Sequence, residues 1–168
     1  YIGDQYNHFL ERDDEFNFMK AIIPNYILEG IYFYSGFSFF YNLGRNGKMP
    51  GTVQEIRYIN RDENTHLWLF RSLINDLKKE REDLFTEEHI KYYTEMLKEG
   101  VEEEIAWGKY AIGDNIAGLN GKMIEDYIKY LGNLRAKGLG FGPIYEGYNE
   151  IPSSMKWVDE YSDPNLSL

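Results

Sequence analysis

The chain contains no cysteine at all. This absence excludes a disulfide framework, a thiolate metal site and a cysteine nucleophile, and it fits a reducing compartment, so we expect a cytoplasmic location. Basic side chains are also few, because 18 Lys and Arg stand against 28 Asp and Glu and give a formal net charge of −10 at pH 7. Affinity for a nucleic-acid backbone comes mostly from clustered Lys and Arg, so we expect no nucleic-acid partner.

The chain also lacks a long hydrophobic run. Its longest apolar stretch, residues 31–41, is interrupted by Ser35, Gly36 and Ser38 and falls short of the roughly 20 residues that span a bilayer. We therefore expect a buried helix there and no membrane contact. The N-terminus has no signal-peptide pattern, and Tyr1 in place of a starting methionine indicates the interior of a longer sequence.

The pattern that is present indicates an all-helical protein. Apolar residues recur at helical spacing along most of the 168 residues, and no alternating strand pattern lies between the turn signals. A composition of 43% hydrophobic and 27% charged residues suits one domain with a hydrophobic core. We predict five helices, at about 4–22, 25–43, 52–79, 87–112 and 120–137.

Turn and cap signals set these boundaries. Pro24 is expected to end the first helix, because its ring disfavours helix in the preceding residue. Thr52 begins a Thr-x-x-Glu capping box and Thr86 precedes two glutamates, so each is a predicted N-cap. From about 138 the glycine and proline content rises, and we expect an irregular segment that is anchored by Ile144, Tyr145, Ile151 and Trp157.

One set of residues carries the spacing of a metal site. Glu29 lies on the second predicted helix, and Glu63 and His66 form a Glu-x-x-His pair on the third. Carboxylate and imidazole ligands suit iron, manganese or zinc, and dimetal helical bundles take a lone Glu from one helix and Glu-x-x-His from another. A complete site needs this pattern twice. The chain contains no second Glu-x-x-His, so it carries one half of such a site.

The neighbouring positions predict an apolar, dry surrounding. Phe33 and Phe37 follow Glu29 at i+4 and i+8, and Ile59 precedes Glu63 by four residues, so each group shares one helix face. The alternative is a solvated Glu63–His66 pair, which is the commoner case for an arbitrary Glu-x-x-His. A buried Glu29 without a metal or a hydrogen-bonding partner would be costly or protonated, which favours the metal site.

Two charged neighbours have open roles. Asp62 precedes His66 by four residues, so it could make a helix-surface contact or accept a hydrogen bond from the free ring N–H of a ligating histidine. Arg61 could pair with a carboxylate in the same interior or be solvated. We expect His8 and His89 to be surface residues, because polar or acidic residues surround both.

The two motifs and later segments together resemble a known family. They are similar to the second metal-ligand half of the small, radical-generating subunit of class I ribonucleotide reductase. The likeness covers nearly the whole chain. The residues that carry it are Leu28-Glu29-Gly30-Ile31-Tyr32-Phe33-Tyr34-Ser35-Gly36-Phe37, Ile59-Asn60-Arg61-Asp62-Glu63-Asn64-Thr65-His66, Ala117-Gly118-Leu119-Asn120, Tyr130-Leu131-Gly132-Asn133-Leu134-Arg135, Asn149-Glu150-Ile151-Pro152 and Trp157.

The resemblance implies a ferritin-like helical fold and specific residue roles. Glu29, Glu63 and His66 would be ligands of one metal in a dinuclear iron or manganese-iron centre, with Glu63 bridging to the second metal. The radical pocket would be formed by Phe33, Phe37 and Ile59. Asp62 would link a metal-bound histidine of the first half to a tryptophan in the long-range path for electrons and protons.

The departures from the family pattern indicate what this chain would need. In the first repeat of the family the radical tyrosine follows the histidine by four residues, but Phe70 occupies that position here. The first-half ligands, the path tryptophan and the flexible C-terminal tail have no counterpart. The resemblance therefore implies three partners: a segment or chain with the first-half ligands, a second complete small subunit in a homodimer, and a large catalytic subunit.

The predicted function is the radical-generating role in ribonucleoside-diphosphate reductase, in which residues 1–168 form the C-terminal half of a ferritin-like dimetal domain. Two alternatives remain open at this point. One is a different ferritin-like di-iron oxidase or monooxygenase, which needs a substrate channel; the match of Asp62 argues against it. The other is a metal-free helical half that serves only as a scaffold.

Overall fold

The chain is described by a computed structural model of residues 15–162, and this part is built from helices. The all-α prediction is confirmed. Among the described residues the β pairing amounts to one isolated bridge, between Ile116 and Leu119. The elements are α2 (Glu15–Ile27), η1 (Leu28–Tyr32), α3 (Tyr34–Arg45), α4 (Pro50–Glu80), η2 (Glu82–Phe85), α5 (Glu87–Ile112), α6 (Gly121–Gly138), η3 (Ser153–Val158) and α7 (Asp159–Ser162).

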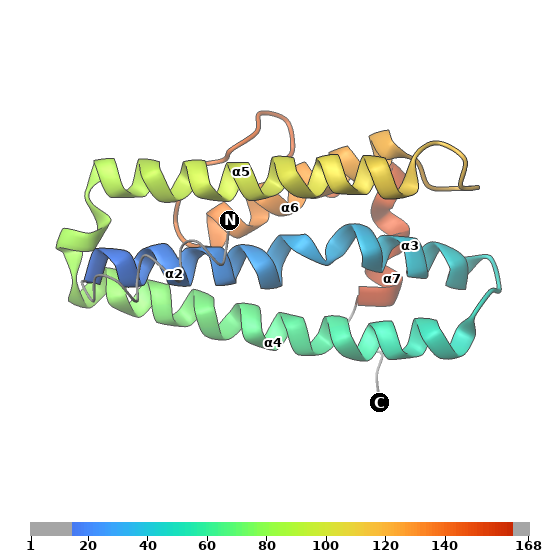
Figure 1. The fold of residues 1–168 in the computed structure, drawn as a ribbon, viewed down its shortest axis with the longest axis horizontal. Coiled ribbons are helices and arrows are strands. Elements are labelled where there is room, and N and C mark those ends of the chain that lie inside the picture. Colours follow the sequence, from blue (N-terminus) through green and yellow to red (C-terminus); the bar gives the residue numbers. More distant parts are fainter. Residues whose placement is uncertain (1–14, 163–168) are drawn as a thin grey trace.

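The long helices lie side by side. Figure 1 shows α2, η1 and α3 as one row along the molecule, with α4 returning antiparallel beside it and α5 running in the same direction as α2 and α3 on the other side. α6 packs against α5 and reaches η1. The core between these helices is made of aliphatic and aromatic side chains, of which the most deeply buried include Tyr26, Ile31, Ile74, Leu97 and Ile128.

The predicted helix end at Pro24 is wrong, because α2 continues through this residue to Ile27. An internal proline removes one backbone hydrogen bond and costs about 3 kcal/mol. Pro24 is buried together with Tyr26 and Ile27, and burial of each large apolar side chain stabilises the helix by about 1.5–3 kcal/mol. Asn25 Nδ2 also donates to the Ala21 carbonyl at 2.8 Å, which adds a hydrogen bond to the disturbed turn.

The interruption lies instead in η1, a π-helical turn between α2 and α3. The predicted helix over 25–43 is thus divided. In a π turn the backbone hydrogen bonds join residues five apart instead of four. Such turns are rare in proteins, and those that occur are often found at functional sites. This turn carries Glu29, so the irregular backbone and the candidate ligand coincide.

The caps agree with the sequence in part. Thr86 is the N-cap of α5 and accepts from His89 N at 3.3 Å, as predicted, and Asn120 caps α6 by accepting from Met123 N at 2.9 Å. The predicted capping box at Thr52 is wrong, because α4 already begins at Pro50. Proline is favoured at the first helical position, where its missing N–H costs nothing, so the helix starts before the box.

α4 is buried along one seam only. Its buried residues are Val53, Asn60, Leu67 and Ile74, which recur every seven residues. The rest of the helix surface includes exposed apolar side chains, among them Trp68, 58% exposed. A narrow seam of this kind is typical of a helix that packs against neighbours on one side and has a second apolar side uncovered.

The segment after α6 packs along the bundle. Ile144, Tyr145, Ile151 and Trp157 are partly buried against the core, and the deepest contacts of this segment come from Met155 and Val158. The buried Asn133 of α6 holds the segment by four hydrogen bonds: its Oδ1 accepts from the N–H groups of Ile144 and Tyr145, and its Nδ2 donates to the carbonyls of Tyr145 and Tyr148.

Replacement of Asn133 by alanine is expected to lower the free energy of unfolding by about 2–4 kcal/mol, because it leaves four part-buried backbone groups without this partner. Urea unfolding followed by circular dichroism measures this change. Asn149→Ala, an exposed residue in the same segment, is the control and should change the midpoint little. An unfolding midpoint of Asn133→Ala equal to that of Asn149→Ala would contradict the anchoring role.

None of the described helices is long and apolar enough to cross a membrane. The cytoplasmic location stays a prediction. The first predicted helix begins at residue 4, and its first part, together with His8, lies outside the described residues.

Candidate metal centre

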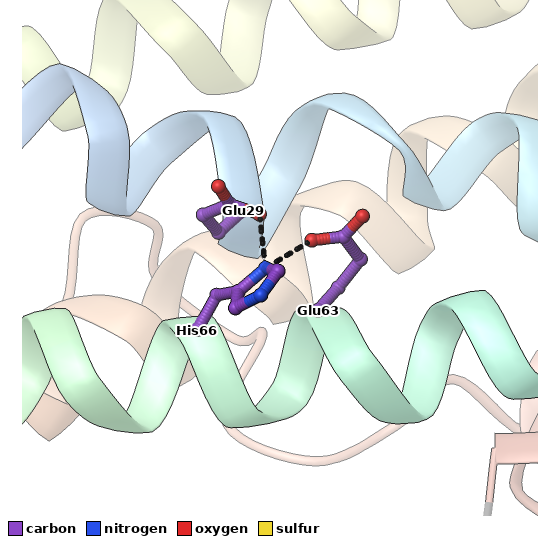
Figure 2. A group of neighbouring side chains, drawn as sticks. All are labelled: Glu29, Glu63 and His66. Atoms are coloured by element: carbon purple, nitrogen blue, oxygen red, sulfur yellow. Dashed lines mark hydrogen bonds and ion pairs between the residues drawn. The ribbon is translucent and has the colours of Figure 1, made fainter.

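The three predicted ligands come together from two elements. Glu29 projects from η1, while Glu63 and His66 project from adjacent turns of α4 toward it, as Figure 2 shows. His66 Nδ1 lies 3.0 Å from Glu63 Oε2 and 3.5 Å from Glu29 Oε2. One ligand atom from each of the three residues lies within 4.8 Å of the other two, so a single ion could contact all of them.

Local structure explains why these side chains converge. Residues three apart on an α-helix lie on one face, so Glu63 and His66 present their polar atoms on the same side of α4. α4 packs directly against η1, and the π turn places Glu29 opposite that face. The arrangement therefore needs both the Glu-x-x-His spacing and the π turn. The spacing can be seen in the sequence, whereas the π turn could not be predicted from it.

The electrostatics of the three residues favour a cation. Burial is the main cause that raises the pKa of Glu29 to about 7; the neighbouring Glu63 acts in the same direction and His66 opposes it. The pKa of His66 is also raised, chiefly by its hydrogen bond with Glu63. Two carboxyl groups that share one site repel each other when both are ionised. A metal ion would relieve this repulsion.

The donor set fits a transition metal. Two carboxylates and one imidazole suit iron, manganese or zinc, whereas Mg²⁺ and Ca²⁺ prefer oxygen ligands alone. The side chains of Glu29 and Glu63 are 16% and 15% exposed, while that of His66 is 53% exposed. The site thus lies at the border of the described bundle, with its histidine on the outer side.

The predicted pocket residues are only partly buried. Phe37 is buried and its ring centroid lies 6.1 Å from that of Phe33. Phe33 and Ile59, however, are 36% and 45% exposed. Within residues 15–162 these side chains do not form a closed pocket, so a dry radical pocket stays a prediction that requires a further segment to cover Phe33 and Ile59.

Asp62 and Arg61 pair with each other on the outside of α4. Arg61 Nη2 lies 3.1 Å from Asp62 Oδ1, and the side chain of Asp62 is 61% exposed. Asp62 hydrogen-bonds Arg61, and the ring of His66 hydrogen-bonds Glu63. Each of the two side chains thus has another hydrogen-bond partner in this structure, and the suggested contact between Asp62 and His66 stays a prediction. Arg61 pairs with a carboxylate on the exposed surface, not in the interior.

His89 also differs from its prediction as a surface residue. It is half-buried, its ring stacks on Phe16 with centroids 4.5 Å apart, and its Nδ1 lies 3.1 Å from the Asp83 carbonyl oxygen. Its position in an acidic first turn suggested solvent, but Phe16 of helix α2 packs against its ring. His89 lies outside the candidate metal centre and packs as part of the α2–α5 contact.

Two buried charged residues near the site were not singled out from the sequence. Glu104 of α5 bonds the chain just after η1, and Arg135 of α6 bonds the carbonyl of Gly30 within η1. Glu104 lies in a run of three glutamates, which is typical of a solvated helix face. The only local signal was the pair Gly100 and Gly108 on its own helix face, since glycine inside a helix often marks close packing.

The fold and the site together define a class of protein. An all-helical bundle in which a lone glutamate meets a Glu-x-x-His pair from another helix is typical of the ferritin-like dimetal-carboxylate proteins. The comparisons with known proteins identify the family within this class. Residues 1–152 match the family model described as ribonucleotide reductase, small chain, and the chain belongs to this family.

Two relatives agree with this assignment. The chain is 60% identical over 166 residues to the ribonucleoside-diphosphate reductase subunit beta of Treponema pallidum (strain Nichols). This alignment covers 99% of the chain and 47% of the relative. It is 41% identical over 165 residues to the subunit of the same name from Halalkalibacterium halodurans, and the alignment covers 98% of the chain and 47% of that relative.

Solved structures show the same fold. The ribonucleotide reductase R2 subunit from Clostridium botulinum matches with a TM-score of 0.91 and 49% identity, over 96% of this chain and 50% of that chain. The ferritin-like fold is therefore confirmed. The chain spans about half the length of the relatives it matches.

Proposed function

We propose that this chain supplies the second ligand half of the metal centre in the radical-generating subunit of ribonucleoside-diphosphate reductase. The observation that carries the proposal is the convergence of Glu29, Glu63 and His66, with all three ligand atoms within 4.8 Å of one another. Membership of the small-chain family supports the same role. It favours this function over another ferritin-like oxidase or monooxygenase.

The proposed cofactor is a dinuclear iron or manganese-iron centre. Glu29, Glu63 and His66 would hold one metal, and Glu63 would bridge to the second. When bound, the centre supplies a one-electron oxidising equivalent for deoxyribonucleotide synthesis. The protein residues bind the metals, exclude water and hold the histidine in place.

The surrounding residues have separate proposed roles. Phe33, Phe37 and Ile59 shield the centre from water once a partner segment covers the two exposed members of this group. Asp62 pairs with Arg61 on the exposed surface of α4, one helical turn before His66. This position suits a link from the metal centre to a group on a neighbouring segment.

The uncovered side of α4 supports the need for a partner segment. Ile59, Leu69 and Leu73 are exposed on this helix and share a side with His66, which is exposed itself. We propose that residues 1–168 form the C-terminal half of the dimetal domain and that a segment with the other three ligands packs on this side. The further proposed partners are a second complete small subunit and the large catalytic subunit, with neither nucleic acid nor membrane among them.

Complementation tests this function. The isolated chain is expected to keep little iron or manganese after dialysis, because three ligands without the bridging partners hold a metal weakly. The chain combined with the first-half segment of a ribonucleotide reductase small subunit, called here the complemented protein, should hold close to two metals per pair by elemental analysis. Two metals are expected because a dimetal bundle has six ligands, and each half provides three of them: one lone glutamate and one Glu-x-x-His pair.

The control is a first-half segment in which the Glu-x-x-His residues are alanine. It should pack with the chain and hold less metal. Two tightly bound metals on the isolated chain, or a metal-free complemented protein after loading, would contradict the proposal. The second result would favour the metal-free scaffold.

A further inference from the structure

A buried carboxylate lies on α5 outside the ligand set. Glu102, Glu103 and Glu104 are consecutive, but the first two are exposed and accept hydrogen bonds from tyrosine hydroxyl groups at the surface. Glu104 is only 3% exposed. Charged side chains are almost never fully buried unless they have a partner, so the contacts of Glu104 require an explanation.

Glu104 contacts the backbone where the regular helix resumes after the π turn. Its Oε1 accepts a hydrogen bond from the Ser35 N–H at 3.0 Å, and this bond is buried. Ser35 is the second residue of α3, immediately beyond η1 and Phe33. First-turn N–H groups of a helix lack regular partners, and here a carboxylate from another helix supplies one.

α5 approaches this segment closely because it carries glycine on the relevant face. Gly100, Glu104 and Gly108 are four residues apart and share one face of α5. A Cβ atom on Gly100 would lie 2.4 Å from Ile27 Cγ2, and one on Gly108 would lie 2.6 Å from Ser35 Oγ. Ile27 and Ser35 lie on either side of η1, and α5 runs parallel to this row in Figure 1. The two glycines therefore bring Glu104 within reach of the interruption.

A second charged side chain, from the neighbouring helix α6, holds the same interruption. Arg135 of α6 is buried, and its Nε donates to the Gly30 carbonyl at 3.0 Å. Gly30 and Ser35 are five residues apart, which is the donor-to-acceptor spacing of a π-helix. One buried carboxylate and one buried guanidinium thus bind the two backbone groups that flank the end of the π turn.

We infer that Glu104 is a positioning residue: it accepts from Ser35 N–H and, together with Arg135, fixes the π turn that presents Glu29 to the metal centre. Glu29 lies next to Gly30 in the chain, so movement of the turn would displace the ligand. This inference rests on the proposed function for its effect on metals, although the contact itself does not.

The cost of burying Glu104 supports a specific role. Burial raises the pKa of Glu104 to about 7, against the opposing effect of the Ser35 hydroxyl and N–H. An apolar side chain of similar size would avoid this desolvation, and such replacements of buried charges are often neutral or stabilising. If Glu104 is a positioning residue, its replacement by an apolar side chain should keep the global stability of the protein but reduce the order of the π turn. If Glu104 only contributed to packing, the two effects would not separate in this way.

The test compares Glu104→Leu with Glu104→Gln in the complemented protein. Leucine fills the space without an acceptor, whereas glutamine keeps a carbonyl oxygen that can accept from Ser35 N–H. Hydrogen exchange of a peptide over residues 28–40 is measured first, in the metal-free protein. We expect exchange about tenfold faster or more in Glu104→Leu and near the wild-type rate in Glu104→Gln.

Metal binding provides the second measurement. Loss of a residue that orients a ligand typically weakens metal binding by about 10- to 100-fold, and we expect this in Glu104→Leu but not in Glu104→Gln. Gly132→Ala is the matched control, because its Cβ would lie 2.7 Å from Val101 Cγ2 and so disturbs the packing of α5 on α6 without touching Ser35. It should lower the thermal midpoint while the exchange rate of 28–40 relative to the rest of the protein stays unchanged.

Three results would overturn the inference: wild-type exchange in Glu104→Leu, fast exchange in Glu104→Gln, or the same local effect in Gly132→Ala. If Glu104→Leu does not fold, Glu104→Asp takes its place, since the shorter side chain withdraws the carboxylate and the same local loss is expected. If the wild-type complemented protein binds no metal, the proposed function fails, but the exchange experiment still decides the role of Glu104.

Discussion

Replacement of His66 or Glu63 by alanine is expected to remove the dinuclear centre from the complemented protein. His66 Nδ1 lies within 3.5 Å of both carboxylates, and within the described residues no other histidine or acidic group joins this cluster. A neighbouring side chain therefore cannot replace the lost bond. The loss of metal affinity should exceed the roughly 10- to 100-fold effect of changing a residue that merely supports a ligand. Elemental analysis after loading and desalting measures it.

The stability of the metal-free protein separates ligation from a structural role. Glu29 and Glu63 destabilise each other when both are ionised, and the raised pKa of Glu29, caused first by burial and then by Glu63, reflects this. Glu63→Ala should therefore leave the thermal midpoint of the metal-free protein unchanged or higher. Glu55→Ala, an exposed glutamate two turns earlier on α4, should change neither metal content nor midpoint. A His66→Ala variant with an intact centre would refute the ligand assignment.

The helix-spacing rule was sufficient for one side of this site. Glu63 and His66 are three residues apart on an amphipathic pattern, so their shared face follows from α-helical geometry alone. The cap at Thr86 was likewise readable, because its hydroxyl and the following acidic residues act within one turn. Both of these interactions close within about one turn of helix, so few other parts of the chain influence them.

The other side of the site depended on contacts between distant segments. Pro24 indicated a helix end by local rules, yet α2 continues through it because the surrounding side chains are buried. The π turn that carries Glu29 is held in place by Arg135, 105 residues from Gly30. No local pattern specifies such a contact. The position of Glu29 along the chain was therefore predictable, but the backbone that aims it was not.

The burial of individual charges could not be predicted for the same reason. Glu102, Glu103 and Glu104 look alike in the sequence, and only the packing of α5 on η1 and α3 distinguishes the third. Conversely, Phe33 and Ile59 were expected to be buried by their apolar character, but they are exposed in residues 15–162. Their exposure and that of His66 occur on the same side of the bundle, which agrees with a partner segment on that side.

Asp62→Asn is expected to separate metal binding from transfer of the oxidising equivalent. Asp62 forms its hydrogen bond with Arg61, not with a ligand, and is 61% exposed on the side where we propose the first-half segment packs. Asparagine keeps the size and a carbonyl acceptor but removes the negative charge. The complemented protein should therefore keep close to two metals. Deoxynucleotide formation with the large subunit should fall by about tenfold or more, because the charge supports a partner group and any proton movement coupled to it.

Metal content and deoxynucleotide formation measured on the same samples decide between the roles. Asp76→Asn is the matched control, because Asp76 is also exposed on α4 and pairs with a basic residue, Lys79, at 2.7 Å. A surface ion pair of this kind contributes at most about 1 kcal/mol, so this variant should keep both its metals and its activity. Full activity of Asp62→Asn would refute the transfer role. Loss of metals in Asp62→Asn would instead show that the negative charge of Asp62 is needed for metal binding itself, before any electron or proton is transferred.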